Sequence, residues 1–593
     1  MVSFTLYFIL ALFCSHSRFP LRGNLGISVF YKSHLTLAIH SRVNSIEQTQ
    51  TEKMKHTIFL FGILALWSAV SVVAEDRYQF FTWEVANGTI FPLGVPQQGI
   101  LINGQFPGPT IEAITNDNIV VNVINKLDEA FLITWSGIKQ RRTTWQDGVS
   151  GTNCPIPPNT NWTYKFQVKD QIGTYTYFAS TKIHKAGGAF GALNVAQRSV
   201  IDTPYLTPYG EFTLLIGDWF KNDHKVLRRI LDAGKGLPFP DALLINGKKD
   251  AVVFTGEAGK TYKFRVSNVG LATSINFRIQ GHSLTLIEIE GAHTLQEVYE
   301  SFDVHVGQSA TFLVTLNVSP SDYYIVASTR FTDPIVLTTT ATLRYSGSNK
   351  KALGPLPIGP TTDVEWSIKQ ARTIRLNLTA NAARPNPQGS FHYGTIPIVR
   401  KIRLENSKAT VNGKLRYAVN GISYINPNTA LKLADWFNIP GVFDFTTIKD
   451  FPPHAAIPAK LGTSVFAITL HDFVEIVFQN NENTIQSWHM DGSSFYVVGY
   501  GNGAWTEDKR QLYNLVDGIT RYTTQVYPNS WTAILVSLDN KGMWNLRSAI
   551  WERRYLGQEV YLRVWNNEQS LYTETNIPEN ALFCGKAKHL HRS

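Results

Sequence analysis

Hydrophobic and polar positions from residue 75 to about residue 200 alternate with the two-residue period of β-strands, in short runs separated by turn residues. In the clearest run, Ile119, Val121 and Val123 alternate with a second row that includes Asn122. Side chains two residues apart point to the same face of a strand, so two partly apolar faces suit a strand inside a sandwich. Helical periodicity is scarce throughout. The pattern therefore predicts an all-β protein.

A short motif, an apolar residue followed by Asn-Gly, opens three similar stretches of the chain. Its asparagines are Asn103, Asn246 and Asn420. In the first two copies a strand that ends in another asparagine, Asn125 or Asn268, follows 22 residues later. In the third copy an insertion of about 40 residues delays the matching strand. The recurrence indicates three related structural units.

Repeats at this separation, each built from short strands, predict three β-sandwich domains in tandem. The boundaries are expected near residue 202 and in the Gly-, Pro- and Ser-rich stretch 346–360, which is typical of a linker. The predicted parts are an upstream extension at 1–53, a signal peptide at 54–74, domains at 75–200 and 201–345, a linker at 346–372, a third domain at 373–585 and a polar tail at 586–593.

The N-terminal region has the features of a secretory signal peptide. Lys55 gives a positive start, residues 58–73 form an apolar core, and small residues precede Ala74, so we expect cleavage after Ala74. Residues 1–53 then form an upstream extension or reflect an alternative start, although the apolar run 4–13 is a second candidate signal core. An N-terminal membrane anchor is the less favoured interpretation, because neither apolar segment is long enough for a clear span.

Secretion also fits the cysteines. Only Cys154 and Cys584 remain after cleavage, and two thiols in an oxidising compartment usually pair, so one disulfide between domains is predicted. The polar C-terminus lacks the apolar tail of a lipid-anchor signal. We therefore expect an extracellular glycoprotein with no transmembrane span after cleavage. Four Asn-x-Ser/Thr acceptor sites point to the same compartment. They lie at Asn87, Asn161, Asn317 and Asn377.

Net charge narrows the choice of partner. The whole chain carries a formal charge of +10, and residues 75–593 carry +6 from 49 basic and 43 acidic residues. Such a mild basic excess suits an anionic cell-wall polysaccharide, although it is more often a solvated surface. No polybasic run or aromatic-basic module argues for nucleic acid. The sequence leaves the oligomeric state open.

The most informative stretch is GMWNLRSAIWERRYLGQ at 542–558. It resembles the ligand cassette of multicopper oxidases, W-x-x-H-C-H-I-x-x-H-x-x-x-G-[ML], with Trp544, Ile550 and Gly557 at the matching spacings. In that cassette one cysteine and three histidines hold a blue copper and part of a three-copper cluster. Here Ser548 replaces the thiolate. The three histidine positions carry Arg547, Ala549 and Arg553, and the axial position carries Gln558. The guanidinium group of an arginine offers no lone pair to a metal.

Other blocks extend the resemblance over essentially the whole mature chain. GILINGQFPGP at 99–109, WQDG at 145–148 and YNLVD at 513–517 resemble the ascorbate oxidase and laccase superfamily. More narrowly, the chain resembles the plant ascorbate-oxidase homologues, the skewed-growth monocopper-oxidase-like proteins, and especially their pollen-specific members. This resemblance implies three cupredoxin-like Greek-key domains. The blocks shared with the pollen-specific members are TWSGI at 134–138, RPNPQG at 384–389 and MWNLRS at 543–548.

The resemblance also implies which positions would hold copper. Active relatives have eight cluster histidines in four His-x-His pairs, because two imidazoles one residue apart on a strand point to the same side. Of the eight cluster histidines only His489 is retained. Copper is therefore implied by the family resemblance and not by the residues present. We predict neither a catalytic residue nor a bound cofactor. The other cluster positions carry Thr134, Ser136, Phe178, Ser180, Asp491, Arg547 and Ala549, and Gln486 stands at a blue-site histidine.

The replacements suggest new contacts. Because Asp491 and Arg547 both stand at cluster positions, we hypothesise that they pair and hold the first domain to the third without metal. The alternative is that each turns outward to water, since buried pairs are costly unless well hydrogen-bonded. We expect His489 to be a hydrogen-bonded histidine, because a lone imidazole binds metal weakly. His184 is expected to be a surface or loop histidine.

Two functions remain. The chain has no Gly-x-Ser-x-Gly elbow, His-Glu-x-x-His motif or phosphate loop, and a carboxylate pair for glycan cleavage would leave no local signature. The first function is that of a non-catalytic secreted glycoprotein of the plant cell wall, which binds wall polysaccharide or a wall protein. The resemblance adds an expected role in cell expansion or pollen-tube growth. The second is a copper-binding oxidoreductase with an altered, single-copper site.

Overall fold

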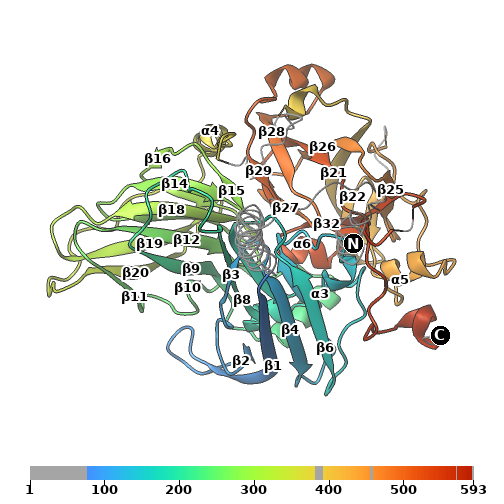
Figure 1. Cartoon of the computed structure of the whole chain (residues 1–593), viewed down its shortest axis with the longest axis horizontal. Helices are drawn as coiled ribbons and strands as arrows, with labels where there is room; N and C mark the ends of the chain where they lie inside the picture. The colour runs from blue at the N-terminus through green and yellow to red at the C-terminus, as the bar shows by residue number, and fades with distance from the viewer. Residues whose placement is uncertain (1–75, 381–391, 454–457, 569, 591–593) are drawn as a thin grey trace, which may run out of the picture. The chain divides into compact units, whose positions relative to one another are not determined.

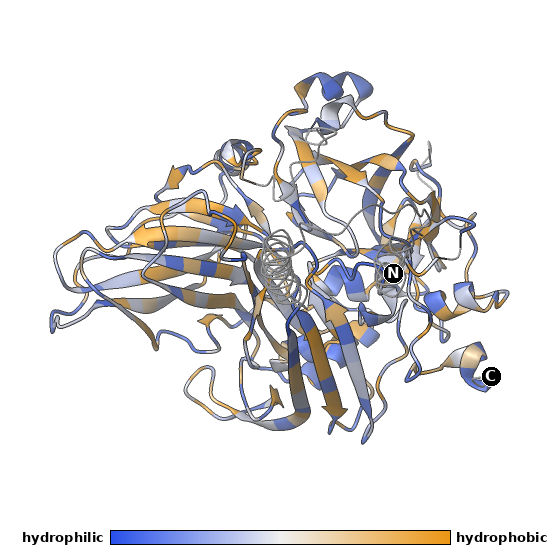
Figure 2. Ribbon diagram, in the orientation of Figure 1, coloured by the Kyte–Doolittle hydropathy of each residue, from blue (hydrophilic) through white to orange (hydrophobic). Residues whose placement is uncertain are grey.

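A computed structural model of the chain describes residues 76–380, 392–453, 458–568 and 570–590, which belong to one compact unit (Figure 1). The predicted extension and signal peptide, and the RPNPQG block, lie outside the described residues. None of the helices in these ranges is long and apolar enough to cross a membrane. The predicted all-β architecture is confirmed, because the described strands form six sheets that pair into three successive sandwiches. Figure 2 shows hydrophobic residues along the strands of all three.

The first sandwich consists of two four-stranded sheets around an aromatic core. Across this core the rings of Trp83 and Tyr177 lie 4.6 Å apart between centroids. The alternating run predicted from the sequence is strand β4, in which Ile119, Val121 and Val123 are fully buried. The sheets have the orders β2-β1-β4-β6 and β3-β8-β7-β5, with β1 Tyr78–Ile90, β2 Gln97–Ile102, β3 Ile111–Ile114, β4 Asn118–Asn125, β5 Ile133–Ser136, β6 Asn161–Gln167, β7 Gly173–Ala179 and β8 Phe190–Ala196.

The second sandwich pairs a seven-stranded sheet with a five-stranded sheet. Its core is aliphatic and aromatic, and Phe277 of one sheet stacks on Phe312 of the other at 6.1 Å between ring centroids. The larger sheet has the order β10-β9-β12-β18-β14-β15, with β16 on β14, and the smaller has the order β11-β20-β19-β13-β17. The strands are β9 Gly210–Trp219, β10 Ala242–Ile245, β11 Val252–Gly256, β12 Thr261–Asn268, β13 Ser274–Ile279, β14 Leu284–Ile289, β15 Ala292–His293, β16 Val298–Tyr299, β17 Phe302–Val304, β18 Ser309–Thr315, β19 Asp322–Arg330 and β20 Thr338–Tyr345.

The third sandwich pairs an eight-stranded sheet with a five-stranded sheet. Phe478 and Trp488, one from each sheet, stack at 5.1 Å between ring centroids. The orders are β24-β23-β22-β21-β26-β31-β28-β29 and β25-β33-β32-β27-β30. The strands are β21 Arg400–Val411, β22 Lys414–Val419, β23 Ile422–Tyr424, β24 Lys460–Gly462, β25 Val465–Thr469, β26 Phe473–Asn480, β27 Gln486–Met490, β28 Phe495–Asn502, β29 Thr520–Arg521, β30 Thr523–Val526, β31 Ser530–Ser537, β32 Gly542–Ser548 and β33 Glu559–Trp565.

Helices are short and lie between strands. Helix α4 occupies the end of the segment 346–372 predicted as a linker and extends to Thr373. It starts after Asp363, whose carboxylate caps the first turn by accepting from the Trp366 backbone N–H at 2.9 Å. Ser367 then donates to Asp303 of the second sandwich at 2.6 Å, so the segment is anchored by packing. The described helices are α3 His224–Asp232, α4 Val364–Thr373, α5 Leu431–Trp436 and α6 Trp551–Tyr555, and the 3₁₀ turns are η1 Thr144–Gln146, η2 His184–Gly187, η3 Tyr393–Thr395, η4 Glu507–Leu512 and η5 Gly585–His589.

The Asn-Gly motif has the same structural role in all three sandwiches. Asn103, Asn246 and Asn420 have φ values of 50°, 46° and 48°, which are left-handed conformations that asparagine tolerates at the tight turn ending β2, β10 and β22. Each side chain also clamps the neighbouring strand by accepting one backbone N–H and donating to one carbonyl. The acceptor contacts are with Glu84, Leu215 and Glu405, and the donor contacts are with Thr82, Thr213 and Arg403.

The second asparagine of each repeat ends a core strand and is buried. Asn125, Asn268 and Asn480 each accept the N–H two residues ahead and donate to two or more carbonyls from other segments. Such Asx turns close a strand end while satisfying backbone groups that would otherwise be buried without a partner. The repeat recognised in the sequence is therefore a repeated hydrogen-bonding device.

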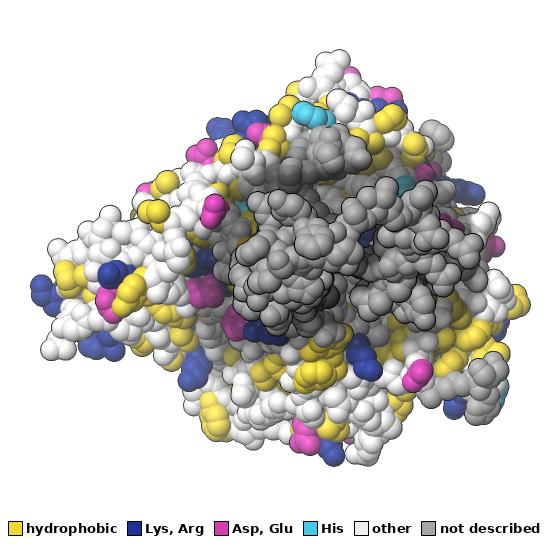
Figure 3. Space-filling model, viewed as in Figure 1, with side chains coloured by type: hydrophobic (Ala, Val, Ile, Leu, Met, Phe, Trp, Pro, Cys, Tyr) yellow, Lys and Arg dark blue, Asp and Glu magenta, His cyan; other side chains and the backbone are white. Residues whose placement is uncertain are grey.

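The surface carries the predicted glycan acceptors and a dispersed charge. Asn87, Asn161 and Asn317 are exposed, whereas Asn377 is half-buried and accepts the Ala380 N–H at 2.9 Å. On the face shown in Figure 3, lysine and arginine side chains are scattered among acidic and neutral ones. The positive net charge therefore forms no single patch on the described part of that face.

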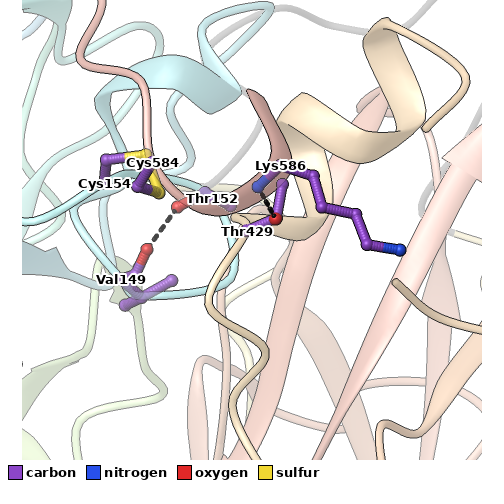
Figure 4. Close-up of a disulfide and its surroundings, with 6 residues drawn as sticks. All are labelled: Val149, Thr152, Cys154, Thr429, Cys584 and Lys586. Atoms are coloured by element: carbon purple, nitrogen blue, oxygen red, sulfur yellow. Dashed lines mark hydrogen bonds between the residues drawn. A yellow bond between two sulfur atoms is a disulfide. The ribbon is translucent and has the colours of Figure 1, made fainter. Parts of the chain in front are cut away.

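The predicted disulfide is confirmed. Cys154 lies in a loop of the first sandwich and Cys584 in the C-terminal segment beyond the third, with Cα atoms 5.7 Å apart (Figure 4). Next to it, the Lys586 N–H donates to Thr429 Oγ1 at 2.7 Å, and the start of the predicted polar tail forms η5. The bond joins points 430 residues apart in the sequence, so it ties the first sandwich to the C-terminal segment.

The repeated asparagines give a prediction on stability. We expect Asn268→Ala to lower the free energy of unfolding by about 3 kcal/mol, because three buried backbone groups lose their partner. Chemical denaturation measures this loss, and Asn428→Ala, at an exposed position, is the control with an expected loss below about 0.5 kcal/mol. Equal losses in the two variants would contradict the clamping role.

Candidate functional site

Four strands bring the sequence-predicted copper positions together at the junction of the first and third sandwiches. Thr134 on β5 is paired with Phe178 on β7, and His489 on β27 is paired with Arg547 on β32. All of these positions except the half-buried Ala549 are less than 9% exposed. The other positions placed in this buried region are Ser136, Ser180, Gln486, Asp491, Ser548, Arg553 and Gln558.

The predicted pairing of Asp491 with Arg547 is confirmed, but both residues belong to the third sandwich, so the pair does not itself join the first domain to the third as hypothesised. Arg547 Nη1 donates to Asp491 Oδ2, and the two side chains are 2% and 3% exposed, so neither turns outward to water. The same guanidinium nitrogen donates to Asn545 Oδ1 at 3.1 Å. Although burial opposes ionisation, the Arg547 cation and a hydrogen bond from His489 hold the pKa of Asp491 well below its usual range. A charge-assisted pair therefore stands at two former ligand positions.

The first sandwich contributes a second carboxyl, Asp147, that the sequence interpretation missed. Burial, followed by the negative charge of Asp491, raises the pKa of Asp147 well above its usual value. The raised pKa favours the neutral acid form of Asp147, whose O–H is a donor suited to the Asp491 carboxylate. The next residue, Gly148, has φ +75°, and a Cβ there would lie 1.7 Å from the Ile133 carbonyl oxygen. The WQDG block thus aims Asp147 across the junction.

His489 is held as a hydrogen-bonded histidine, as expected. Its Nδ1 lies 2.7 Å from Thr523 Oγ1, and its Nε2 lies 3.0 Å from Asp491 Oδ1. Burial and then the Arg547 cation lower its pKa, so the ring is neutral at pH 7. Both ring nitrogens already have partners, so the single nitrogen lone pair of the neutral ring is not free to bind a metal.

The blue-copper positions are joined by a chain of side-chain hydrogen bonds. Gln486 Nε2 donates to Asn480 Oδ1 at 2.9 Å, and Gln558 Nε2 donates to Gln486 Oε1 at 2.8 Å. Arg553 Nη1 then donates to Gln558 Oε1 at 3.2 Å, and its Nη2 pairs with Glu482. Amide and guanidinium groups thus fill the space where the family motif has a thiolate and imidazoles.

On the first-sandwich side, the replacements are packing and backbone contacts. Phe178 meets Trp551 of α6 edge to face, at 5.9 Å between ring centroids, and Lys185 Nζ lies 4.5 Å from the centre of the Phe178 ring. Ser180 donates to the Gly148 carbonyl. These contacts cross the junction or support it without any metal ligand.

The residue set does not fit copper. Tight copper sites need several convergent imidazole, thiolate or thioether ligands. Here one neutral histidine with both nitrogens bonded stands beside a buried arginine, whose charge would repel a metal cation. In the described ranges, no group of three or more His, Cys, Asp or Glu side chains is placed to hold a metal ion. The fold supplies the frame of the site, and the side chains supply a salt bridge.

The prediction that His184 is a surface or loop histidine is wrong. It lies in η2, is 1% exposed, and its Nε2 is 3.1 Å from Glu129 Oε2. Burial lowers its pKa to about 4. The residues around His184 in the sequence are only partly apolar, so they do not predict its burial. The burial depends on the second sandwich, whose His224 ring lies 5.6 Å from the His184 ring between centroids.

Comparison with known proteins places this geometry in a family. Three models described as multicopper oxidase match residues 84–200, 210–348 and 428–570, so the chain belongs to the multicopper oxidase family and its sandwiches are cupredoxin-like. It is 52% identical over 546 residues to the L-ascorbate oxidase homolog of Brassica napus, which covers 90% of this chain and 98% of that protein. It is 50% identical over 557 residues to the monocopper oxidase-like protein SKU5 of Arabidopsis thaliana, covering 90% and 94%.

A solved structure confirms the fold. The crystal structure of Fet3p, described as a multicopper oxidase that functions in iron import, matches with a TM-score of 0.70 at 20% identity, covering 82% of this chain and 90% of that chain. Identity at this level shows a shared fold. The resemblance inferred from the ligand cassette is therefore confirmed at the level of family.

The raised pKa of Asp147 gives a prediction. We expect Asp147→Asn to change the free energy of unfolding at pH 7 by less than about 1 kcal/mol, because the amide is isosteric with a neutral acid and donates to the same carboxylate. An infrared difference spectrum should show that the variant loses the C=O band of a protonated carboxyl at neutral pH.

Asp539→Asn is the control, because Asp539 is 39% exposed and pairs with Arg141 at 2.7 Å. Its substitution should leave the protonated-carboxyl band in place. Absence of that band from the unsubstituted protein at neutral pH would contradict the assignment.

Proposed function

We propose that this protein is a secreted glycoprotein of the plant cell wall that is not an oxidase and that uses the oxidase fold for binding or architecture. The observation that carries the proposal is the buried Arg547–Asp491 pair at two of the positions where active relatives hold copper. A guanidinium cannot be deprotonated in a protein, so this position cannot revert to a ligand when copper is supplied.

Several features support the extracellular part of the proposal. The sequence before residue 75 has the pattern of a signal peptide, and the chain holds a disulfide, which persists in oxidising compartments. Three of the four glycan acceptor asparagines are exposed. The named relatives are plant proteins. We infer a role in cell expansion or pollen-tube growth from the family resemblance, with wall polysaccharide or a wall protein as the partner.

A second candidate is a copper-binding oxidoreductase with a single altered site. Its specific support is His489, whose imidazole lies beside the Asp491 carboxylate, together with the name of a relative, monocopper oxidase-like protein. For copper to bind there, His489 would have to give up one hydrogen bond and the ion would have to approach Arg547. We favour the first function because both changes cost free energy.

Copper content separates the two candidates. Protein purified from its secretory route, incubated with copper and dialysed, is expected to hold only background copper by elemental analysis and to consume no oxygen with ascorbate or phenols. His489→Gln is the matched variant and should give the same copper content. Stoichiometric copper that survives dialysis and is lost in His489→Gln, with oxygen-consuming turnover, would overturn the proposal.

A further inference from the structure

A cavity of about 350 Å³ lies at the junction of the first and third sandwiches, next to the former copper positions. Ser180, which stands at one of those positions, is part of its wall. Its volume falls in the range of about 300–1,000 Å³ that is usual for small-molecule sites. The polar residues that line it include Ser150, Ser180 and Lys182 from the first sandwich and Asn426, Arg554 and Glu559 from the third.

Arg554 is the unusual member of this wall. Its side chain is only 11% exposed, yet in the described part of the chain its guanidinium donates no hydrogen bond that meets ordinary criteria. The nearest carboxylate oxygen is Glu559 Oε2, at 3.8 Å from Nε, which is an ion pair without hydrogen-bond contact. A largely buried guanidinium with open donors is costly unless a ligand or water accepts from them.

Arg554 is also held in place. Its guanidinium lies 5.1 Å from the centre of the Trp551 ring, a cation–π contact. Trp551 is in turn fixed, because its Nε1 donates to the Lys182 carbonyl at 2.8 Å and its ring packs on Phe178. The donors of Arg554 therefore point from a rigid support, and little conformational entropy is lost when a ligand binds.

The surrounding charges select the kind of ligand. A guanidinium matches a carboxylate with two parallel hydrogen bonds. Lys182 adds a second positive charge but is already 3.1 Å from Glu129, and Glu559 brings a buried carboxyl to the same wall. These charges therefore favour a ligand with one negative charge over a ligand with several. Ser150 and Asn426 are neutral hydrogen-bonding groups that suit hydroxyls.

We propose that this cavity binds a small hydroxylated monocarboxylate, the chemistry of a uronic acid residue, with Arg554 as the group that binds its carboxylate. The cavity also has an apolar wall against which a sugar ring can pack. This wall is formed by Pro155 and Ala130 of the first sandwich and by the Trp551 ring. A uronic acid would be the ligand of the proposed cell-wall binding function, and the proposal rests on that function because the cell wall would supply the ligand. It requires no copper.

The test uses the full-length secreted protein with two sugars of the same size, D-galacturonate and D-galactose. Calorimetric titration is expected to show binding of galacturonate at least tenfold tighter than that of galactose, because the two differ in the group that meets Arg554. Arg554→Gln should weaken galacturonate binding by at least tenfold. Arg141→Gln is the matched control, because Arg141 pairs with Asp539 at a different pocket and should bind like the unsubstituted protein.

A second variant guards against a folding defect in Arg554→Gln. Asn426 is exposed at the cavity rim, so Asn426→Trp should fold normally and obstruct the entrance, with the same loss of binding. Trigalacturonate distinguishes the source of the ligand: equal or tighter binding than the monomer indicates the end of an acidic polysaccharide, and exclusion indicates a free sugar acid. Either result supports a uronic acid site.

Three binding results would each overturn the inference, and so would a fourth result, the absence of binding. The first three are equal affinity for galactose and galacturonate, inorganic phosphate binding more tightly than galacturonate, and unchanged binding in both Arg554→Gln and Asn426→Trp. Absence of any binding would also overturn it while leaving the proposed function to be judged by copper content, so the two failures can be told apart.

Discussion

The structure beside the junction depends on one buried ion pair of the third sandwich, between Arg547 on β32 and Asp491, the residue that follows β27. Burying two charges is costly, and their mutual attraction offsets that cost only when every remaining donor and acceptor is well placed. Here Asn545 and His489 supply further contacts, and Asp147 from the first sandwich interacts electrostatically with the same carboxylate, whereas Arg547 Nη2 has no hydrogen-bond partner among the described residues. The pair is therefore the centre of a network that includes both sandwiches.

Around this pair the junction is held by contacts of different physical kinds. An amide chain through Gln486 and Gln558 fills the blue-copper positions with hydrogen bonds between neighbouring side chains. Phe178 packs against Trp551 across the junction, and the Cys154–Cys584 disulfide ties the first sandwich to the C-terminal segment. The amide chain lies within the third sandwich, whereas the Phe178–Trp551 contact and the disulfide connect the first sandwich to the third and to the C-terminal segment.

Much of this could be predicted from the sequence, because the signals were local or came from the family. The period-two run of β4, the Asn-Gly repeats and the loss of ligand residues are all visible in short stretches, and the pairing of Asp491 with Arg547 follows from their shared position in the motif. The role of Asp147, the burial of His184 and the open donors of Arg554 could not be predicted. Each depends on a neighbour far away in the sequence, such as Asp491 for Asp147.

The most direct measurement is a double-mutant cycle on the ion pair, carried out by chemical denaturation in an Asp147→Asn background so that no second carboxyl can replace Asp491. If the pair stabilises the third sandwich at the junction, Arg547→Met and Asp491→Leu should each cost about 3–5 kcal/mol, because each leaves one buried charge unpaired. The double variant should cost less than either single variant. Costs that simply add, or single costs below about 1 kcal/mol, would contradict the claim that a salt bridge has taken the structural place of copper.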